Sequence, residues 1–311
     1  MMLLADATPP APGAREVMAR AESENFPVAS RVLPRRVRTH LLAVYGFARL
    51  VDELGDSAPG DRLAALDRLE HELDRAYAGT AEHPLMRRLG ETVRACAIPR
   101  APFERLIEAN RVDQRVSRYQ TWAQLRGYCA LSADPVGEIV LEVFGVATPE
   151  RIAWSDSICT ALQLAEHCQD VAEDFTAGRV YLPLEDLERF GSSVEQIAAG
   201  IEAANAPAKR PAGGGGAAAP LREVIAFELE RGRTLLDAGA PLIAELRGRE
   251  RLAVAAFSAG GRAAFDAIER AGCDVLSGPP SASSARRLLA LLATLLRRPA
   301  AAAAPAGASR T

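Results

Sequence analysis

The sequence has no strong excess of either charge. Its 37 Lys and Arg residues are set against 40 Asp and Glu, which gives a formal net charge of -3. A protein that binds nucleic acid by neutralising phosphates along its whole surface is strongly basic, so this class is excluded and no nucleic-acid partner is expected. With 49% hydrophobic and 25% charged residues, wholesale disorder is excluded as well, and a large core is expected.

Cysteine is sparse, and the sequence contains no CxxC pair. The five cysteines are odd in number and widely spread, which argues against a disulfide framework or a zinc site and indicates a reducing compartment. The N-terminus also lacks the continuous apolar stretch of a signal peptide, because Asp6 and several prolines interrupt it. We therefore predict a cytoplasmic protein.

No run of 18 apolar residues is present, so a transmembrane helix is not expected. Near the C-terminus, nine uncharged residues, 288–296, lie between pairs of arginines. Two interpretations of this segment stay open. It could lie in the membrane interface, with its arginines at the headgroups, which would make the protein peripheral at the inner face of the membrane. Alternatively, it is a helix docked on the core or a frayed tail.

Apolar residues recur every three or four positions, as in Leu63, Leu66, Leu69 and Leu73, and β-branched runs are rare. This period is typical of amphipathic helices, and prolines and glycines divide the chain into helices of ordinary length. The pattern predicts an all-α protein over residues 14–275.

We divide the chain into a flexible N-terminus (1–13), one α-domain (14–278) and a basic, alanine-rich tail (279–311). The low-complexity segment 203–220 is expected to be a loop inside the domain. The helices predicted after it, 221–246 and 252–271, are too few to bury their apolar faces alone, so a separate domain there is disfavoured.

Acidic residues recur at helical spacing in two segments. At about 100° per residue, each group lies within an arc of about 100°. The first group is Tyr45, Arg49, Asp52, Glu53 and Asp56. The second group is Gln163, Glu166, Asp170, Glu173 and Asp174.

Either acidic stripe alone could be a solvated helix face, since acids at such spacing repel one another only weakly. The apolar residues around both stripes indicate buried helices instead, and buried carboxylates persist only when cations neutralise them. An all-oxygen ligand set suits Mg²⁺, which bridges carboxylates to substrate phosphates. Together with Arg49 and Arg179, two facing stripes predict a magnesium–diphosphate site.

These motifs resemble those of the squalene/phytoene synthase family, especially its hopanoid-pathway branch of hydroxysqualene synthases. DELGD and QDVAED resemble the two aspartate-rich motifs of that family, and further segments extend the similarity over most of residues 20–275. The segments are DELGD (52–56), QDVAED (169–174), GRVYLP (178–183), ENFPVASRVLP (24–34), YCALSADPVG (128–137) and residues 249–272.

The resemblance implies the all-α terpenoid synthase fold with a central cavity, and a prenyl diphosphate substrate held through two or three Mg²⁺ ions. Asp52, Asp56, Asp170 and Asp174 would hold the ions, Glu53 and Glu173 would complete their shell, and Arg49 and Arg179 would grip the diphosphate. Tyr45 and Tyr128 would face the cavity and Gln163 would line its polar end. Phe26, Phe47, Tyr128, Val136 and Val140 are the candidate apolar walls.

The reaction implied is conversion of presqualene diphosphate to hydroxysqualene, without NADPH, with pathway enzymes that supply the substrate as possible partners. The first alternative is condensation of two farnesyl diphosphates to presqualene diphosphate or squalene. The second is a catalytically impaired lipid-binding or assembly subunit.

Several residues depart from the family pattern. Glu53 stands where a second Asp is common, and His167 and Cys168 replace the usual bulky apolar pair. Glu166 stands where Asn is usual and adds an anion beside the expected metals. For its neighbour His167, we favour pairing with a nearby acid over a role in proton transfer. Asp134 is also unusual, and its simplest interpretation is a helix cap before Pro135.

Overall fold

The computed structural model describes residues 33–205 and 219–297, and every regular element within these ranges is helical. The predicted all-α fold is therefore confirmed, and the one β contact of the described residues is an isolated bridge between Arg118 and Val180. Segment 1–13, Phe26 and most of the predicted loop 203–220 lie outside the described residues. The elements are α3 (Arg35–Asp52), η2 (Glu53–Ser57), α4 (Arg62–Ala78), α5 (Pro84–Cys96), α6 (Ala101–Asp113), α7 (Trp122–Ser132), α8 (Asp134–Phe144), α9 (Pro149–Gln169), α10 (Val171–Thr176), α11 (Leu184–Arg189), α12 (Val194–Asn205), α13 (Ala219–Ala238), α14 (Ala240–Glu245), α15 (Gly248–Arg270) and α16 (Ser284–Leu296).

The helix boundaries follow local sequence signals. Pro84 and Pro149 occupy the first position of α5 and α9, where the missing N–H of proline costs no hydrogen bond. Before α9, the Thr148 hydroxyl accepts a hydrogen bond from the N–H of Arg151 at 3.2 Å. Proline and side-chain caps therefore determine where these helices begin.

The single helix predicted over residues 221–246 is wrong, because the chain breaks at Gly239 between α13 and α14. Pro241 has no N–H to continue the helical ladder. A side chain on Gly239 would also lie 2.4 Å from Cγ1 of Ile158 and 2.8 Å from the carbonyl oxygen of Trp154. The close approach to α9 therefore requires glycine. The next predicted helix, 252–271, corresponds to α15.

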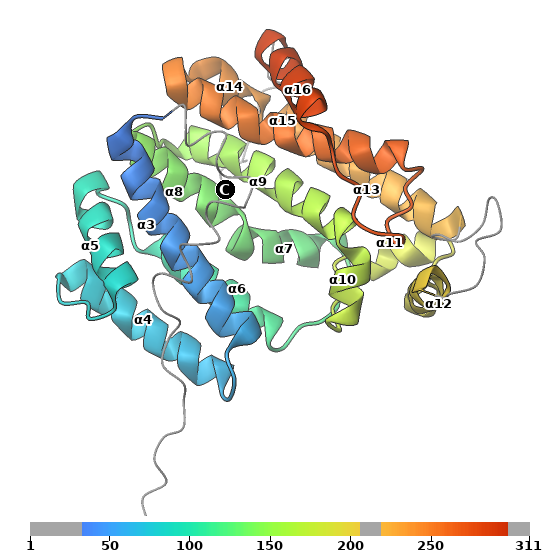
Figure 1. Cartoon of the computed structure of the whole chain (residues 1–311), viewed down its shortest axis with the longest axis horizontal. Coiled ribbons are helices and arrows are strands. Elements are labelled where there is room, and N and C mark those ends of the chain that lie inside the picture. The colour runs from blue at the N-terminus through green and yellow to red at the C-terminus, as the bar shows by residue number, and fades with distance from the viewer. Residues whose placement is uncertain (1–32, 206–218, 298–311) are drawn as a thin grey trace, which may run out of the picture.

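Helix α9 runs through the middle of the molecule and contacts α7, α8, α10, α13, α14 and α15 (Figure 1). One cluster of buried side chains is built mainly by α3–α6 and includes Leu66, Leu69 and Leu73 of the predicted amphipathic stripe. Leu63, the fourth member of that stripe, is 37% exposed. A second cluster surrounds α9, α13 and α15.

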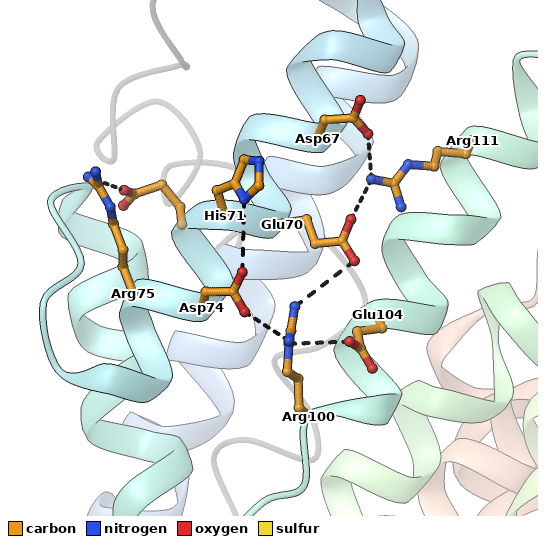
Figure 2. A network of polar contacts seen from close by, with 9 residues as sticks. Asp67, Glu70, His71, Asp74, Arg75, Arg100, Glu104 and Arg111 are labelled. Carbon is orange, nitrogen blue, oxygen red and sulfur yellow. Dashed lines mark hydrogen bonds and ion pairs between the residues drawn. The ribbon is translucent and has the colours of Figure 1, made fainter.

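A network of ion pairs connects α4 with α6 (Figure 2). The Arg111 guanidinium on α6 donates to Asp67 and to Glu70 on α4, with both distances at 2.6 Å. Arg100, directly before α6, pairs with Asp74 at 2.8 Å. The network holds α6 in place, and this helix also supplies one wall of the cavity described below.

Residues 284–296 form α16, which packs along α15. Leu291 and Leu295 face the core, whereas Leu288, Leu289, Leu292 and Leu296 are exposed. The segment is thus a helix docked on the core, with an apolar row on its outer side. No helix of the described part of the chain is long and apolar enough to cross a membrane.

Candidate active site

Residues of both acidic segments line one cavity of about 340 Å³. Helices α3, α6, α7, α8, α9 and α10 contribute to its wall. Seven of the residues predicted for the site line this cavity: Asp52, Asp56, Tyr128, Gln163, Asp170, Asp174 and Arg179.

The first acidic segment leaves α3 through the π-helical turn η2. The backbone of this turn lies so close to α6 that a Cβ on Gly55 would lie 2.0 Å from Oδ1 of Asn110. The side-chain amide of Gln114 donates to the Gly55 carbonyl at 3.0 Å and fixes the turn on α6. Asp52 and Asp56 line the cavity from here, whereas Glu53 does not.

The second acidic segment is not one continuous helix, which corrects the regular geometry assumed from the sequence. Helix α9 ends at Gln169, Asp170 has φ -101° and ψ 17°, and α10 begins at Val171. The break redirects the side chains that follow it. Asp170 and Asp174 line the cavity, but Glu173, placed in the same arc by the regular geometry, does not.

The two acidic segments lie on facing walls and are connected directly. The guanidinium of Arg179 donates to a carboxylate oxygen of Asp56 at 2.8 Å. Tyr45 and Arg49 of α3 do not line the cavity: Tyr45 is buried, and Arg49 is 3.7 Å from Asp52.

The carboxylates of the cavity raise one another's pKa values. Glu166 is exposed to the cavity that it lines, yet the surrounding protein desolvates its carboxylate, and this desolvation together with the charge of Asp170 and Asp52 raises its pKa to about 7. Burial and Asp170 also raise the pKa of Asp174 to about 7, although Arg179 acts against this rise. The wall therefore carries more negative charge than the nearby arginine neutralises, and it favours a bound cation.

Within residues 33–205 and 219–297, no three His, Cys, Asp or Glu side chains converge into a metal site of their own. Mg²⁺ does not need such a cage, because it is commonly held by one or two carboxylates together with waters and substrate phosphates. An all-carboxylate donor set on two facing walls, with space between them, fits this mode of binding.

One wall of the cavity is a group of aromatic rings anchored by Asp113, which the sequence prediction missed. Its two carboxylate oxygens accept hydrogen bonds from the Tyr128 hydroxyl at 2.7 Å and the Tyr181 hydroxyl at 2.9 Å. The Tyr181 ring stacks on Tyr128 and on His167, with centroid distances of 5.4 and 4.2 Å. Tyr181 belongs to the GRVYLP motif, so the motif could have revealed it, whereas nothing in the sequence marked Asp113.

Three further expectations about this region are wrong. Phe47 is fully buried against Phe103 and does not line the cavity. Val140 does not line it either, whereas Val136, another of the predicted wall residues, does. His167 pairs with no acid: its Nε2 is buried without a hydrogen-bond partner among the described residues.

The unusual Asp134 does not cap α8. Its buried carboxylate pairs with Arg126 at 2.8 Å and accepts a hydrogen bond from the Thr160 hydroxyl at 2.8 Å. The residue therefore connects α7, α8 and α9 behind the cavity, which is a structural role that a neutral residue could not fill in the same way.

An all-helical fold with a central cavity between two acidic motifs is the terpenoid synthase fold. Residues 19–289 match the profile of the family described as Squalene/phytoene synthase, and the chain belongs to this family. The crystal structure of squalene synthase HpnC from Alicyclobacillus acidocaldarius superposes with a TM-score of 0.75 at 44% identity and covers 84% of this chain and 93% of that one.

Two named relatives align over shorter segments. A hydroxysqualene synthase of Sinorhizobium fredii is 38% identical over 180 residues, which cover 57% of this chain and 60% of that protein. A phytoene synthase of Mycobacterium tuberculosis is 31% identical over 178 residues, covering 57% and 58%. The aligned segment thus spans about 60% of the length of these curated relatives.

Proposed function

We propose that this protein converts presqualene diphosphate to hydroxysqualene and releases diphosphate in a Mg²⁺-dependent reaction. The observation that carries the proposal is the opposition of the two acidic segments across one cavity, joined by the contact between Arg179 and Asp56. The similarity to proteins named hydroxysqualene synthase and to HpnC supports the choice of reaction.

In this proposal, Asp52 and Asp56 on one wall and Asp170 and Asp174 on the other hold two or three Mg²⁺ ions. Bound Mg²⁺ supplies positive charge to the leaving diphosphate. Arg179 exchanges its contact with Asp56 for the diphosphate oxygens, to which a guanidinium can donate two hydrogen bonds.

Residues behind the cavity wall position those that face it. Arg49, 3.7 Å from Asp52, orients this carboxylate. We assign Tyr45, Glu53 and Glu173 to similar indirect roles, since none of them lines the cavity.

The stacked rings of Tyr128 and Tyr181 suit a carbocation, because the face of an aromatic ring attracts positive charge. Asp113 holds both hydroxyls and therefore fixes the rings against the cavity. Gln163 and Glu166 lie at the polar end, where they orient the water that captures the cation. No role for NADPH is included, since water supplies the hydroxyl group.

Two alternatives have support of their own. Relatives named phytoene synthase and a solved structure named squalene synthase favour condensation of two farnesyl diphosphates to presqualene diphosphate or squalene. Glu166, an extra anion among the expected metal ligands, favours an impaired lipid-binding or assembly subunit, because it would repel diphosphate.

Product analysis by mass spectrometry distinguishes these functions. The protein is incubated with Mg²⁺ and presqualene diphosphate, and separately with farnesyl diphosphate, each with and without NADPH. Hydroxysqualene from presqualene diphosphate alone supports the proposal, whereas presqualene diphosphate or squalene made from farnesyl diphosphate supports condensation. Absence of any product, together with unchanged Mg²⁺ binding in Asp52→Ala and Asp170→Ala, supports the impaired subunit.

We also propose that α16 makes a peripheral contact with the cytoplasmic face of the membrane, where the enzyme that supplies presqualene diphosphate would deliver this amphiphilic product. Leu289 and Leu292 are 65% and 50% exposed, beside Arg286 and Arg287. Sedimentation with anionic vesicles tests the contact. We expect Leu289→Gln with Leu292→Gln to remain in the supernatant, whereas vesicle binding equal to that of the unchanged protein contradicts it.

A further inference from the structure

A second cavity, of about 260 Å³, lies between α14, α15 and the end of α16, and none of its lining residues belongs to the first cavity. Its polar lining consists of Arg251, Ser258 and Arg262 from α15, Thr294 from α16 and Arg297 directly after α16. The α15 residues recur at seven- and four-residue intervals, so they form one stripe that faces α16.

Four buried polar atoms, all on residues that line this cavity, have no hydrogen-bond partner among the described residues. They are Nε of Arg251, Oγ of Ser258, Nε of Arg262 and Oγ1 of Thr294. Ser258 is fully buried and Thr294 is 6% exposed. Buried serine and threonine in helices ordinarily bond to a carbonyl of the preceding turn, and unsatisfied buried groups are rare in native proteins. Their concentration in one cavity indicates a missing partner.

The chemistry of these atoms defines that partner. The Nε of each arginine can only donate, and both hydroxyls can donate as well, so the ligand must offer several acceptor atoms. The other ends of the arginines are already held, because Arg251 donates to the Leu295 carbonyl at 3.1 Å and Arg262 to Asp237 at 2.6 Å. These contacts fix the guanidinium groups through their terminal nitrogens, and neither contact uses an Nε hydrogen.

The charges of the cavity match a dianion. Asp237 is the one carboxylate recorded in contact with these three arginines in the described part of the chain, and it pairs with Arg262 and Arg297. Three guanidinium groups and one carboxylate leave a net charge of +2. A phosphate monoester carries a charge of about -1.5 to -2 at neutral pH and offers three free oxygens.

We propose that this cavity is a second anion site, which binds the phosphate group of a phosphate ester. Ile243, Ala244 and Leu296 form its apolar part, beside the exposed leucines of α16, so the ester carries an apolar group. The phosphate could belong to a membrane lipid or to a free amphiphilic phosphate. The inference does not depend on the proposed reaction.

Calorimetric titration of inorganic phosphate into the full chain tests the site. EDTA removes metal-dependent binding, and an Arg179→Gln background removes the arginine of the first cavity. The Arg179→Gln protein is the parent in this experiment, and we expect it to bind one equivalent of phosphate. Thr294→Val keeps the side-chain shape and removes one donor, and Arg262→Gln removes the charge; each should weaken binding roughly 10- to 100-fold. Thr234→Val on the exposed side of α13 is the matched control and should bind as the parent does.

Flotation with phosphatidylcholine vesicles, with and without phosphatidic acid, distinguishes the two sources. If phosphatidic acid increases flotation of the parent but not of Thr294→Val, the source is a lipid headgroup. If phosphate binds in solution and phosphatidic acid has no effect, the source is a free phosphate ester. The proposal is overturned if the parent responds to neither probe, or if Thr294→Val responds as the parent does. Should Arg262→Gln fail to fold, Thr294→Val alone decides.

Discussion

Arg179 donates a hydrogen bond to Asp56 at 2.8 Å, although the two residues are 123 positions apart in the sequence. The contact joins the segment after α10 to the π-helical turn η2, and thus the two acidic walls of the cavity. Arg179 is 21% exposed and Asp56 is 51% exposed, so both remain accessible to a ligand that enters between them.

We expect Arg179→Gln to impair diphosphate release much more than it impairs folding. A half-exposed ion pair contributes at most about 1 kcal/mol to stability, whereas loss of a bidentate phosphate contact should lower kcat/KM by about 100-fold or more. Kinetics and urea unfolding of the same preparation measure both effects. Arg179→Lys keeps the charge without the planar fork and should have intermediate activity. Activity equal to that of the unchanged protein in Arg179→Gln contradicts the assignment.

The closeness of Gly55 to Asn110 predicts that Gly55→Ala displaces the first acidic motif. The added methyl group would lie 2.0 Å from the Asn110 amide oxygen, so η2 and Asp56 must shift away from α6. We expect a loss of about 1–3 kcal/mol in the free energy of unfolding and reduced Mg²⁺-dependent diphosphate binding. Gly127→Ala is the control, because a Cβ there meets nothing within 4 Å. A Gly55→Ala variant as stable and as active as the control is the opposite outcome.

Asp113 should act through the two tyrosines that it holds. In Asp113→Asn, one amide oxygen and one NH₂ group replace two acceptors, so only one tyrosine hydroxyl can still donate to this side chain and the other must turn to accept from the NH₂ group. We expect a fall of about tenfold in kcat with KM little changed, because the aromatic wall would lose its fixed orientation. Tyr181→Phe, which keeps the ring, should fall less. Equal kinetic constants for Asp113→Asn and the unchanged protein would show that the anchoring has no role.

His167 makes stability depend on pH. Burial lowers its pKa from 6.5 to about 3, so below pH 6.5 the unfolded chain takes up a proton that the native protein does not. Its contribution is complete above pH 6.5 and is lost as the pH falls toward 3. Between pH 6.5 and pH 5 we expect a loss of about 2 kcal/mol.

The variant His167→Phe isolates this effect, because it keeps a ring against Tyr181 and cannot titrate. Urea unfolding at pH 7, 6 and 5 gives the free energy of unfolding of each protein. The nearby carboxylates titrate in both proteins, so their effect cancels in the difference between the two free energies. The difference should shrink or turn in favour of the phenylalanine variant as the pH falls. A difference independent of pH between 7 and 5 is incompatible with a buried neutral histidine.

The sequence predicted the parts of the structure that depend on local signals. Helical period and proline positions were sufficient for the all-α fold, although the single helix predicted over residues 221–246 is in fact two. Charge burial together with the family motifs identified seven residues that line the cavity. Glu53 and Glu173 do not line it, because the turn at η2 and the break at Asp170 depart from regular helix geometry. These departures depend on contacts between helices. Asp113 escaped prediction for a similar reason, since its partners are 15 and 68 residues away.

The most direct test of the account measures diphosphate binding by calorimetry, with Mg²⁺ and with EDTA, for the unchanged protein and for one variant from each wall. We predict that Asp52→Asn and Asp170→Asn each lose most of the Mg²⁺-dependent affinity and that EDTA removes it from the unchanged protein. If a variant on either wall binds diphosphate in Mg²⁺ as tightly as the unchanged protein, the two walls do not share one ligand and the account is wrong.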